Sequence, residues 1–176
     1  AFIIRHAPLF VLTGAGVSTG SGIPDYRDQE GRWKGAEPIR YQPFLRDPEA
    51  RRRYWARSFS GWPRVAAAAP NGAHRALTLL ERAGCIHQLV TQNVDGLHQR
   101  GGARRVIDLH GRLDRVHCLD CGTGLTRDWM QDRLAEANPG WIPAPGATLR
   151  PDGDASLAQA PVAGFQVPAC PRCGGQ

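Results

Sequence analysis

The stretch "GAGVSTGSGIPDYR", residues 14–27, decides the fold class of this chain, because it follows directly on the apolar run "PLFVLT", residues 8–13. A short apolar run that ends at glycines is typical of a buried strand. A strand followed by a glycine loop is how a dinucleotide-binding unit begins, with backbone N–H groups close to a phosphate. The usual spacing needs a third glycine where Thr19 stands. The loop therefore predicts an anion-binding turn, with a plain strand-to-helix turn as its alternative.

The chain after this loop alternates helices and strands. "PNGAHRALTLLERAG", residues 70–84, has helical spacing, and Asn71 can cap its start. Strands are predicted over Cys85–Thr91 and over residues 104–109. This order predicts an α/β fold with a parallel sheet, whose ligands gather at the carboxyl ends of the strands.

Polar side chains follow two of these strand ends. Gln92, Asn93 and Asp95 suit an amide or ribose hydroxyls, and Asx-turn capping of the next helix is the alternative. His110 ends the third strand, where an imidazole is the natural general base for a hydroxyl, although a histidine satisfied structurally is the alternative. We expect these groups and the glycine loop to share one crevice.

Four cysteines form two pairs, Cys118-x-x-Cys121 and Cys170-x-x-Cys173. Each pair places two thiolates on one side of a tight turn, and two such turns complete a tetrahedral zinc site. Disulfides or free thiols are the alternatives, which we rank below zinc because we expect a chain that is not secreted. Four thiolates fill the coordination sphere, so one structural zinc ion is predicted rather than a catalytic one.

The basic charge of the chain comes from arginine: the net charge is +6 and Lys34 is the only lysine. Abundant arginine, alanine, glycine and proline indicate GC-rich coding, which we favour over nucleic-acid binding as the cause. A hydrophobic share of 41% and a charged share of 22% predict a folded globular protein.

No apolar run approaches the roughly 20 residues that cross a bilayer. We expect no membrane partner, and a location in the cytoplasm, or in the mitochondrial matrix if a targeting segment has been removed.

The sequence predicts two parts. Residues 1–115 form a Rossmann-like part with the first half of a doubly wound sheet, and residues 116–176 form a small zinc-ribbon module. A helical insertion at about 28–70 includes a helix near Pro48–Ser58. We expect its aromatic side chains to pack inward while its arginines stay in water.

Together, "GAGVSTGSGIPDYR", "TQNVDGLH", "LHG" and the paired Cys-x-x-Cys resemble the sirtuins, the NAD-dependent protein-lysine deacylases. "RYWARSFSGWP", "PDGD" and "FQVPACPRCGG" further resemble the class II branch. The resemblance implies a Rossmann-type domain and a zinc ribbon, with NAD and the acylated lysine of a protein substrate in the same cleft.

The resemblance also implies residue roles. In the family's reaction the acyl oxygen attacks the ribose carbon as nicotinamide leaves, and a histidine, here His110, deprotonates a ribose hydroxyl so that the acyl group moves to ADP-ribose. Mono-ADP-ribosyl transfer is a variant on the same cofactor. The catalytic residues implied are His110 and Asn93. The residues implied to bind NAD are Gly14, Ala15, Gly16, Ser18, Ile23, Asp25, Tyr26, Arg27, Gln92, Asn93, Val94 and Asp95.

Two departures from the family pattern matter. The chain stops at Gln176, where sirtuins continue into the strands that hold adenosine, so we expect residues 1–176 alone to bind NAD poorly and turn over little. Tyr54-x-x-Arg57 has the form of a pair that selects acidic acyl groups in another sirtuin branch. We favour a plain helical face for it. The alternative function is a non-catalytic zinc-ribbon module that contacts protein or nucleic acid through its arginine-rich face.

Overall fold

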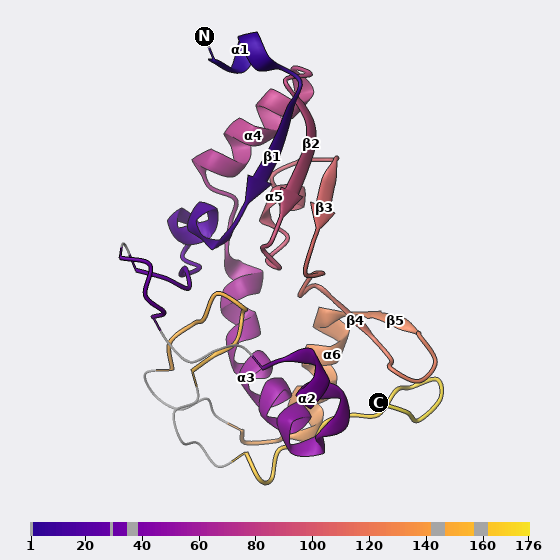
Figure 1. Cartoon of the computed structure of the whole chain (residues 1–176). Coiled ribbons are helices and arrows are strands. Elements are labelled where there is room, and N and C mark those ends of the chain that lie inside the picture. The colour runs from indigo at the N-terminus through magenta and orange to yellow at the C-terminus, as the bar shows by residue number, and fades with distance from the viewer. Residues whose placement is uncertain (1, 29, 35–38, 142–146, 157–161) are drawn as a thin grey trace. The chain divides into compact units, whose positions relative to one another are not determined.

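The computed structural model describes residues 2–28, 30–34, 39–141, 147–156 and 162–176 (Figure 1). These residues divide into two compact units, residues 1–35 with 65–112 and residues 36–64 with 113–176. The helices and strands are α1 (Phe2–His6), β1 (Leu9–Thr13), a 3₁₀ helix (Ala15–Ser21), α2 (Tyr41–Arg46), α3 (Pro48–Ala67), α4 (Gly72–Arg82), β2 (Ile86–Thr91), α5 (Leu97–Arg100), β3 (Val106–Asp108), β4 (Arg115–His117), β5 (Gly124–Thr126) and α6 (Arg127–Ala137).

The first unit contains the predicted parallel sheet, with its strands in the order β1-β2-β3. Leu12 pairs with Val90, which pairs with Ile107, so the three strands run in register toward one edge. The parallel, Rossmann-like arrangement is confirmed, and each strand is slightly shorter than expected. Because neighbouring strands lie about 4.8 Å apart, the ends of β1 and β3 are about 10 Å apart.

The two edge strands of this sheet, β1 and β3, expose apolar side chains. Phe10 and Leu12 of β1 are 67% and 57% exposed, and Ile107 of β3 is 48% exposed. The central strand is buried, with Leu89 and Val90 at 1% and 5%. A three-stranded sheet with apolar edges agrees with the expected half of a doubly wound sheet.

Asn71 fixes the start of α4, as predicted. Its Oδ1 accepts from the N–H groups of Ala73 and His74 at 2.9 and 3.4 Å, and His74 Nδ1 accepts from the N–H of Asn71 at 3.2 Å. The same side chain does more than cap. Its Nδ2 donates to the Val17 carbonyl at 2.8 Å and to Ser21 Oγ at 3.0 Å. Asn71 therefore ties α4 to the glycine loop.

Helix α3 continues beyond the predicted end at Ser58, although Pro63 lies inside it. Proline has no N–H, so the Phe59 carbonyl loses its helical donor. Gln131 Nε2 of α6 donates to that carbonyl at 3.0 Å and replaces the lost bond. A side chain far along the chain thus allows the helix to pass through the proline.

The core of the second unit lies between α3, α6 and the segment around Phe165. Ala56, Met130, Leu134 and Phe165 are its buried members. Thr126 caps α6, accepting from the N–H of Trp129 at 3.2 Å. The predicted helix around Thr126–Ala137 is confirmed.

The expectation that the arginines of α3 stay in water is wrong for Arg51. Arg51 is 9% exposed, and its Nη1 donates to the carbonyls of Phe44 and Leu45 at 2.8 and 2.9 Å. These carbonyls close α2, where no further turn of helix supplies donors. The guanidinium therefore acts as a C-terminal cap for the preceding helix.

Within the described residues, no helix combines the length and the apolar character that crossing a membrane requires.

Candidate functional site

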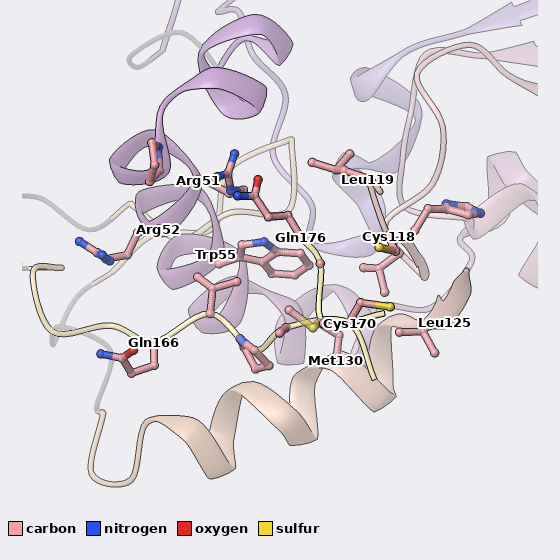
Figure 2. Close-up of a pocket in the computed structure, with 18 of the residues that line it drawn as sticks. Arg51, Arg52, Trp55, Cys118, Leu119, Leu125, Met130, Gln166, Cys170 and Gln176 are labelled. Carbon is pink, nitrogen blue, oxygen red and sulfur yellow. The ribbon is translucent and has the colours of Figure 1, made fainter. Parts of the chain in front are cut away.

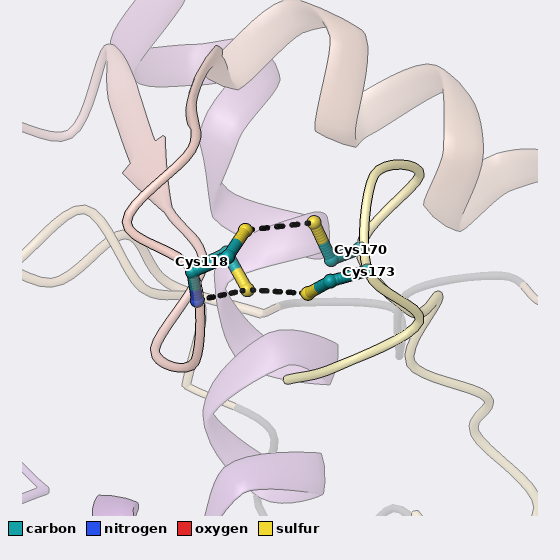
Figure 3. Close-up of side chains that lie close together, drawn as sticks. Cys118, Cys170 and Cys173 are labelled. Carbon is teal, nitrogen blue, oxygen red and sulfur yellow. Dashed lines mark hydrogen bonds between the residues drawn. The ribbon is translucent and has the colours of Figure 1, made fainter.

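Four cysteine sulfurs lie together in the second unit (Figure 3). The Sγ atoms of Cys118, Cys121, Cys170 and Cys173 are all within 4.8 Å of one another. Cys118 and Cys173 are separated by 3.6 Å, and Cys121 and Cys170 by 3.8 Å. Four sulfurs about 2.3 Å from a tetrahedral zinc ion are about 3.8 Å apart, whereas a disulfide bond is about 2.05 Å long. The cluster fits one structural zinc ion bound by four thiolates.

The two cysteine turns are built alike. Gly122 and Gly174 both have φ of 70°, and their N–H groups donate to the carbonyls of Cys118 and Cys170 at 3.0 and 2.9 Å. Such a positive φ is strained for any residue with a Cβ. Glycine therefore lets the backbone turn sharply directly after the second cysteine of each pair.

Hydrogen bonds also prepare the first turn for metal. The N–H of Cys121 donates to Cys118 Sγ at 3.4 Å. Thr123 Oγ1 lies 3.1 Å from Cys121 Sγ and lowers the pKa of that thiol to about 6. The thiolate is the form that binds metal. The short β4–β5 hairpin that carries this turn was not predicted, because three-residue strands are too short for a periodic pattern.

In the first unit, hydrogen bonds join the glycine loop to the loop after β2. Ser18 Oγ donates to Asp95 Oδ2 at 2.6 Å, and Asn93 Nδ2 donates to Ser18 Oγ and to the Gly14 carbonyl, both at 3.1 Å. Ser18 is fully buried and Asn93 is 9% exposed. Asp95 Oδ1 accepts from the N–H of Leu97 at 2.8 Å, so the expected capping role is also present. Two distant motifs therefore form one bonded group at the carboxyl edge of the sheet.

The backbone around this group is open on the loop side. Gly14 precedes the 3₁₀ helix that begins at Ala15, and no described heavy atom lies within 4 Å of where a Cβ would stand on Gly14 or Gly16. Ile23, 3% exposed, closes the loop by donating its N–H to the Ser18 carbonyl at 3.3 Å. Hydrogen bonds to Asn93 and Ile23 thus hold the loop in place, while its backbone at Gly14 and Gly16 remains accessible.

Gln92 and His110 are exposed at the same edge of the sheet, and Val94 is half-buried between the loop residues. The N–H of Gln92 donates to the Thr13 carbonyl at 3.0 Å. The His110 ring makes no hydrogen bond or ion pair with another described residue. Both side chains are therefore open to a ligand.

Asp25, Tyr26 and Arg27 lie in a small separate turn. Asp25 pairs with Lys34, whose hydrogen bond lowers the pKa of that carboxyl group. The Arg27 guanidinium lies 4.6 Å from the centre of the Trp33 ring and donates to the Gly31 carbonyl at 2.6 Å. Neither Asp25 nor Arg27 bonds to the Ser18–Asp95 group in the described part of the chain. These contacts of Asp25 and Arg27 thus lie within this turn.

Two buried histidines, His74 of α4 and His98 of α5, have no role that the sequence pattern predicts. His98 Nε2 lies 2.9 Å from Thr13 Oγ1 at the end of β1, and the rings of His98 and His74 are 4.8 Å apart. Both are buried, at 1% and 0% exposure. Their role depends on contacts between α4, α5 and β1, which no local pattern reveals.

Protonation of His98 is expected to destabilise the fold in mild acid. Burial, with a smaller contribution from His74, lowers the pKa of His98 from 6.5 to about 4. The unfolded chain gains this proton below about pH 6.5 and the folded chain only near pH 4, so stability is lost as the pH falls between them. We expect the free energy of unfolding to fall by about 2 kcal/mol between about pH 7 and pH 4.5. Urea unfolding of wild type and His98→Gln over this range measures it, and an identical pH dependence of the two proteins would contradict it.

Tyr54 and Arg57 both contact other residues of the second unit. Arg57 Nη2 lies 3.3 Å from Asp154 Oδ2, and Asp154 is 2% exposed. Burial raises the pKa of Asp154 to about 7 and that of Tyr54 to about 12. The Tyr54 ring packs edge-on against Phe44 and Trp55. These contacts support the interpretation of the pair as part of a helical face.

A bonded glycine loop on a parallel sheet and a four-thiolate metal site are features of an α/β nucleotide-binding protein with a structural zinc module. The sequence model of the Sir2 family matches residues 14–175. The chain belongs to the Sir2 family.

The relatives carry consistent names. "NAD-dependent protein deacetylase 2" of Bradyrhizobium diazoefficiens is 55% identical over 174 residues, which are 99% of this chain and 63% of the relative. "NAD-dependent protein deacetylase" of Xanthomonas axonopodis pv. citri is 54% identical over 99% of this chain and 59% of its own length. A solved structure of a Sir2 protein bound to a propionylated peptide has a TM-score of 0.67 at 29% identity, covering 98% of this chain and 57% of that one. The chain spans less than two thirds of the length of these relatives.

Proposed function

We propose that this chain supplies the cofactor loop, the catalytic histidine and the zinc module of an NAD-dependent protein-lysine deacylase. The observation that carries the proposal is the group formed by Gly14, Ser18, Asn93 and Asp95, in which two loops are bonded at the carboxyl edge of the sheet. The names of the relatives support the enzyme over the non-catalytic module. Because the chain matches 59% to 63% of those relatives, the activity of the whole protein belongs to the proposal.

The residues present fit NAD. The diphosphate would lie against the open backbone at Gly14, Ala15 and Gly16, where N–H groups at the start of the 3₁₀ helix have no helical acceptor. Both donors of Asn93 Nδ2 are engaged within the protein. Its Oδ1 therefore remains to accept from a ribose hydroxyl.

The bonded carboxylate and the free imidazole have different tasks. Ser18 and the Leu97 N–H hold Asp95 in place by donating to its two oxygens, and this carboxylate would accept from the nicotinamide carboxamide. NAD, when bound, would supply the ribose carbon that the acyl oxygen attacks and the nicotinamide that leaves. The exposed His110 ring would take the proton of a ribose hydroxyl as a general base. The acyl donor is the modified lysine of a protein substrate.

The test is nicotinamide release from NAD with an acetyl-lysine peptide, using the protein expressed from its complete gene. We expect His110→Ala to lower the steady-state rate of peptide-dependent release by about 10²- to 10⁴-fold, because each turnover needs the general base that moves the acyl group. His87→Ala, which removes an exposed histidine of β2, is the matched control and should keep the wild-type rate. Release that needs no acylated peptide, or that survives His110→Ala, would contradict the proposal.

A further inference from the structure

The second unit contains a pocket of about 350 Å³ that the proposed reaction does not use (Figure 2). Its walls come from α2 and α3, from β4, β5 and α6, and from the chain on either side of Cys170. The volume falls in the range typical of small-molecule sites. All of the lining belongs to one compact unit.

The apolar wall of the pocket is formed by side chains held in place. Trp55, Met130 and Phe165 line it, and Figure 2 shows the Trp55 indole between Arg51 and Met130. The Trp55 ring is fixed by the Tyr54 ring at 5.4 Å and by the Arg127 guanidinium at 5.6 Å. Such a preformed aromatic surface favours a flat or branched apolar group.

The positive charge of the lining comes from two arginines of α3. Arg51 and Arg52 line the pocket, and none of its described lining residues is Asp or Glu. Arg52 pairs with Glu49, which lies outside the lining, whereas Arg51 is held through Nη1 by two backbone carbonyls. In the described part of the chain only Nη1 of Arg51 is bonded, so Nε and Nη2 keep donors for a ligand.

We propose that this pocket binds a small monocarboxylate with an aromatic or branched apolar body. The carboxylate pairs with Nε and Nη2 of Arg51, and the apolar body packs on Trp55, Met130 and Phe165. A planar guanidinium that is already oriented loses little entropy when it forms a forked bond to a carboxylate.

The pocket favours this class over a highly charged phosphate. A phosphate ester would bring about two negative charges to one anchored guanidinium. A monocarboxylate matches the single forked donor, and its body removes apolar surface from water at about 25 cal/mol per Å².

The test is calorimetric titration of the zinc-loaded chain with 2-naphthylacetate and with its neutral counterpart, 2-naphthylacetamide. Because the two probes share one apolar body, their difference reports the carboxylate. We expect the acid to bind at least about tenfold more tightly than the amide. The measurement needs no NAD, so it stands or falls independently of the proposed function.

Two variants and one control locate the site. Arg51→Gln should weaken binding of the acid by about tenfold and leave binding of the amide unchanged. Arg53→Gln removes an exposed arginine of the same helix that does not line the pocket, and should bind both probes as wild type does. If Arg51→Gln does not fold, Leu119→Glu decides, because Leu119 is 42% exposed and lines the pocket. Its new carboxylate should repel the acid more than the amide.

Equal affinity of the wild type for the two probes, or no binding of either, would overturn the proposal. So would acid binding that survives both Arg51→Gln and Leu119→Glu, because the probe would then lie elsewhere on the chain.

Discussion

Replacing Cys170 with serine should release the zinc ion and unfold much of the second unit. Zinc is expected at one ion per chain, held by sulfurs that are 3.6 and 3.8 Å apart in two pairs. A structural zinc ion contributes on the order of 10 kcal/mol, which equals the whole stability of a typical domain. The loss therefore exceeds what the remaining contacts of this unit can offset.

The reason lies in how little else holds the second cysteine turn. Besides bonds within the turn, Leu119 donates its N–H to the Gln176 carbonyl and Asp120 accepts from the Gln176 N–H, both at 2.7 Å, and Arg172 Nη1 donates to Thr123 Oγ1 at 3.5 Å. These bonds join exposed or half-buried residues and contribute about 1 kcal/mol each. The metal is thus the main link between the turn at Cys118 and the turn at Cys170.

Zinc content by elemental analysis and near-ultraviolet circular dichroism measure this result. Trp55 and Trp129 line the pocket beside the cluster, so loss of their fixed packing should remove near-ultraviolet signal. Cys85→Ser is the matched control, because Cys85 lies outside the cluster, and it should keep one zinc ion and the wild-type spectrum. A Cys170→Ser protein with full zinc and an unchanged spectrum would show that the four thiolates are not the metal site.

The features that sequence predicted correctly are those that a few neighbouring residues determine. Asn71 and Thr126 cap their helices through local N–H groups, and a Cys-x-x-Cys turn has its shape within four residues. The parallel order of the strands followed from the alternation of strand and helix, because such a connection crosses over a helix.

The features that sequence missed depend on partners far along the chain. Arg51 was expected in water because a charged helical residue usually is, but α2 presents carbonyls that need a donor. Helix α3 was expected to end early, and Gln131 of α6 satisfies the carbonyl that Pro63 leaves open. The same holds for the candidate site, where His98 bonds to Thr13 across 85 residues. No periodic or spacing argument identifies such pairs.

Gly61 of α3 is a position where a single methyl group should have a large effect. A Cβ there would stand 2.1 Å from the Gly153 carbonyl oxygen and 2.8 Å from Ala155 N and from the Asp154 carbonyl carbon. All three atoms are backbone, so no side chain can rotate away. The segment lies this close because the Ala155 N–H donates to the Arg57 carbonyl of α3 at 3.0 Å.

We therefore expect Gly61→Ala to lower the free energy of unfolding by about 4 kcal/mol, at the upper end for a single substitution. The methyl group must push residues 153–155 off the helix, which breaks the Ala155 bond and separates buried Asp154 from Arg57. Gly72→Ala is the matched control, because Gly72 begins α4 with no described heavy atom within 4 Å of its Cβ position. Alanine has the higher helix propensity, so that variant should be neutral or more stable by up to about 1 kcal/mol. Urea unfolding of the three proteins separates steric overlap from propensity: similar stability of Gly61→Ala and wild type would mean that the segment 153–155 does not lie against α3.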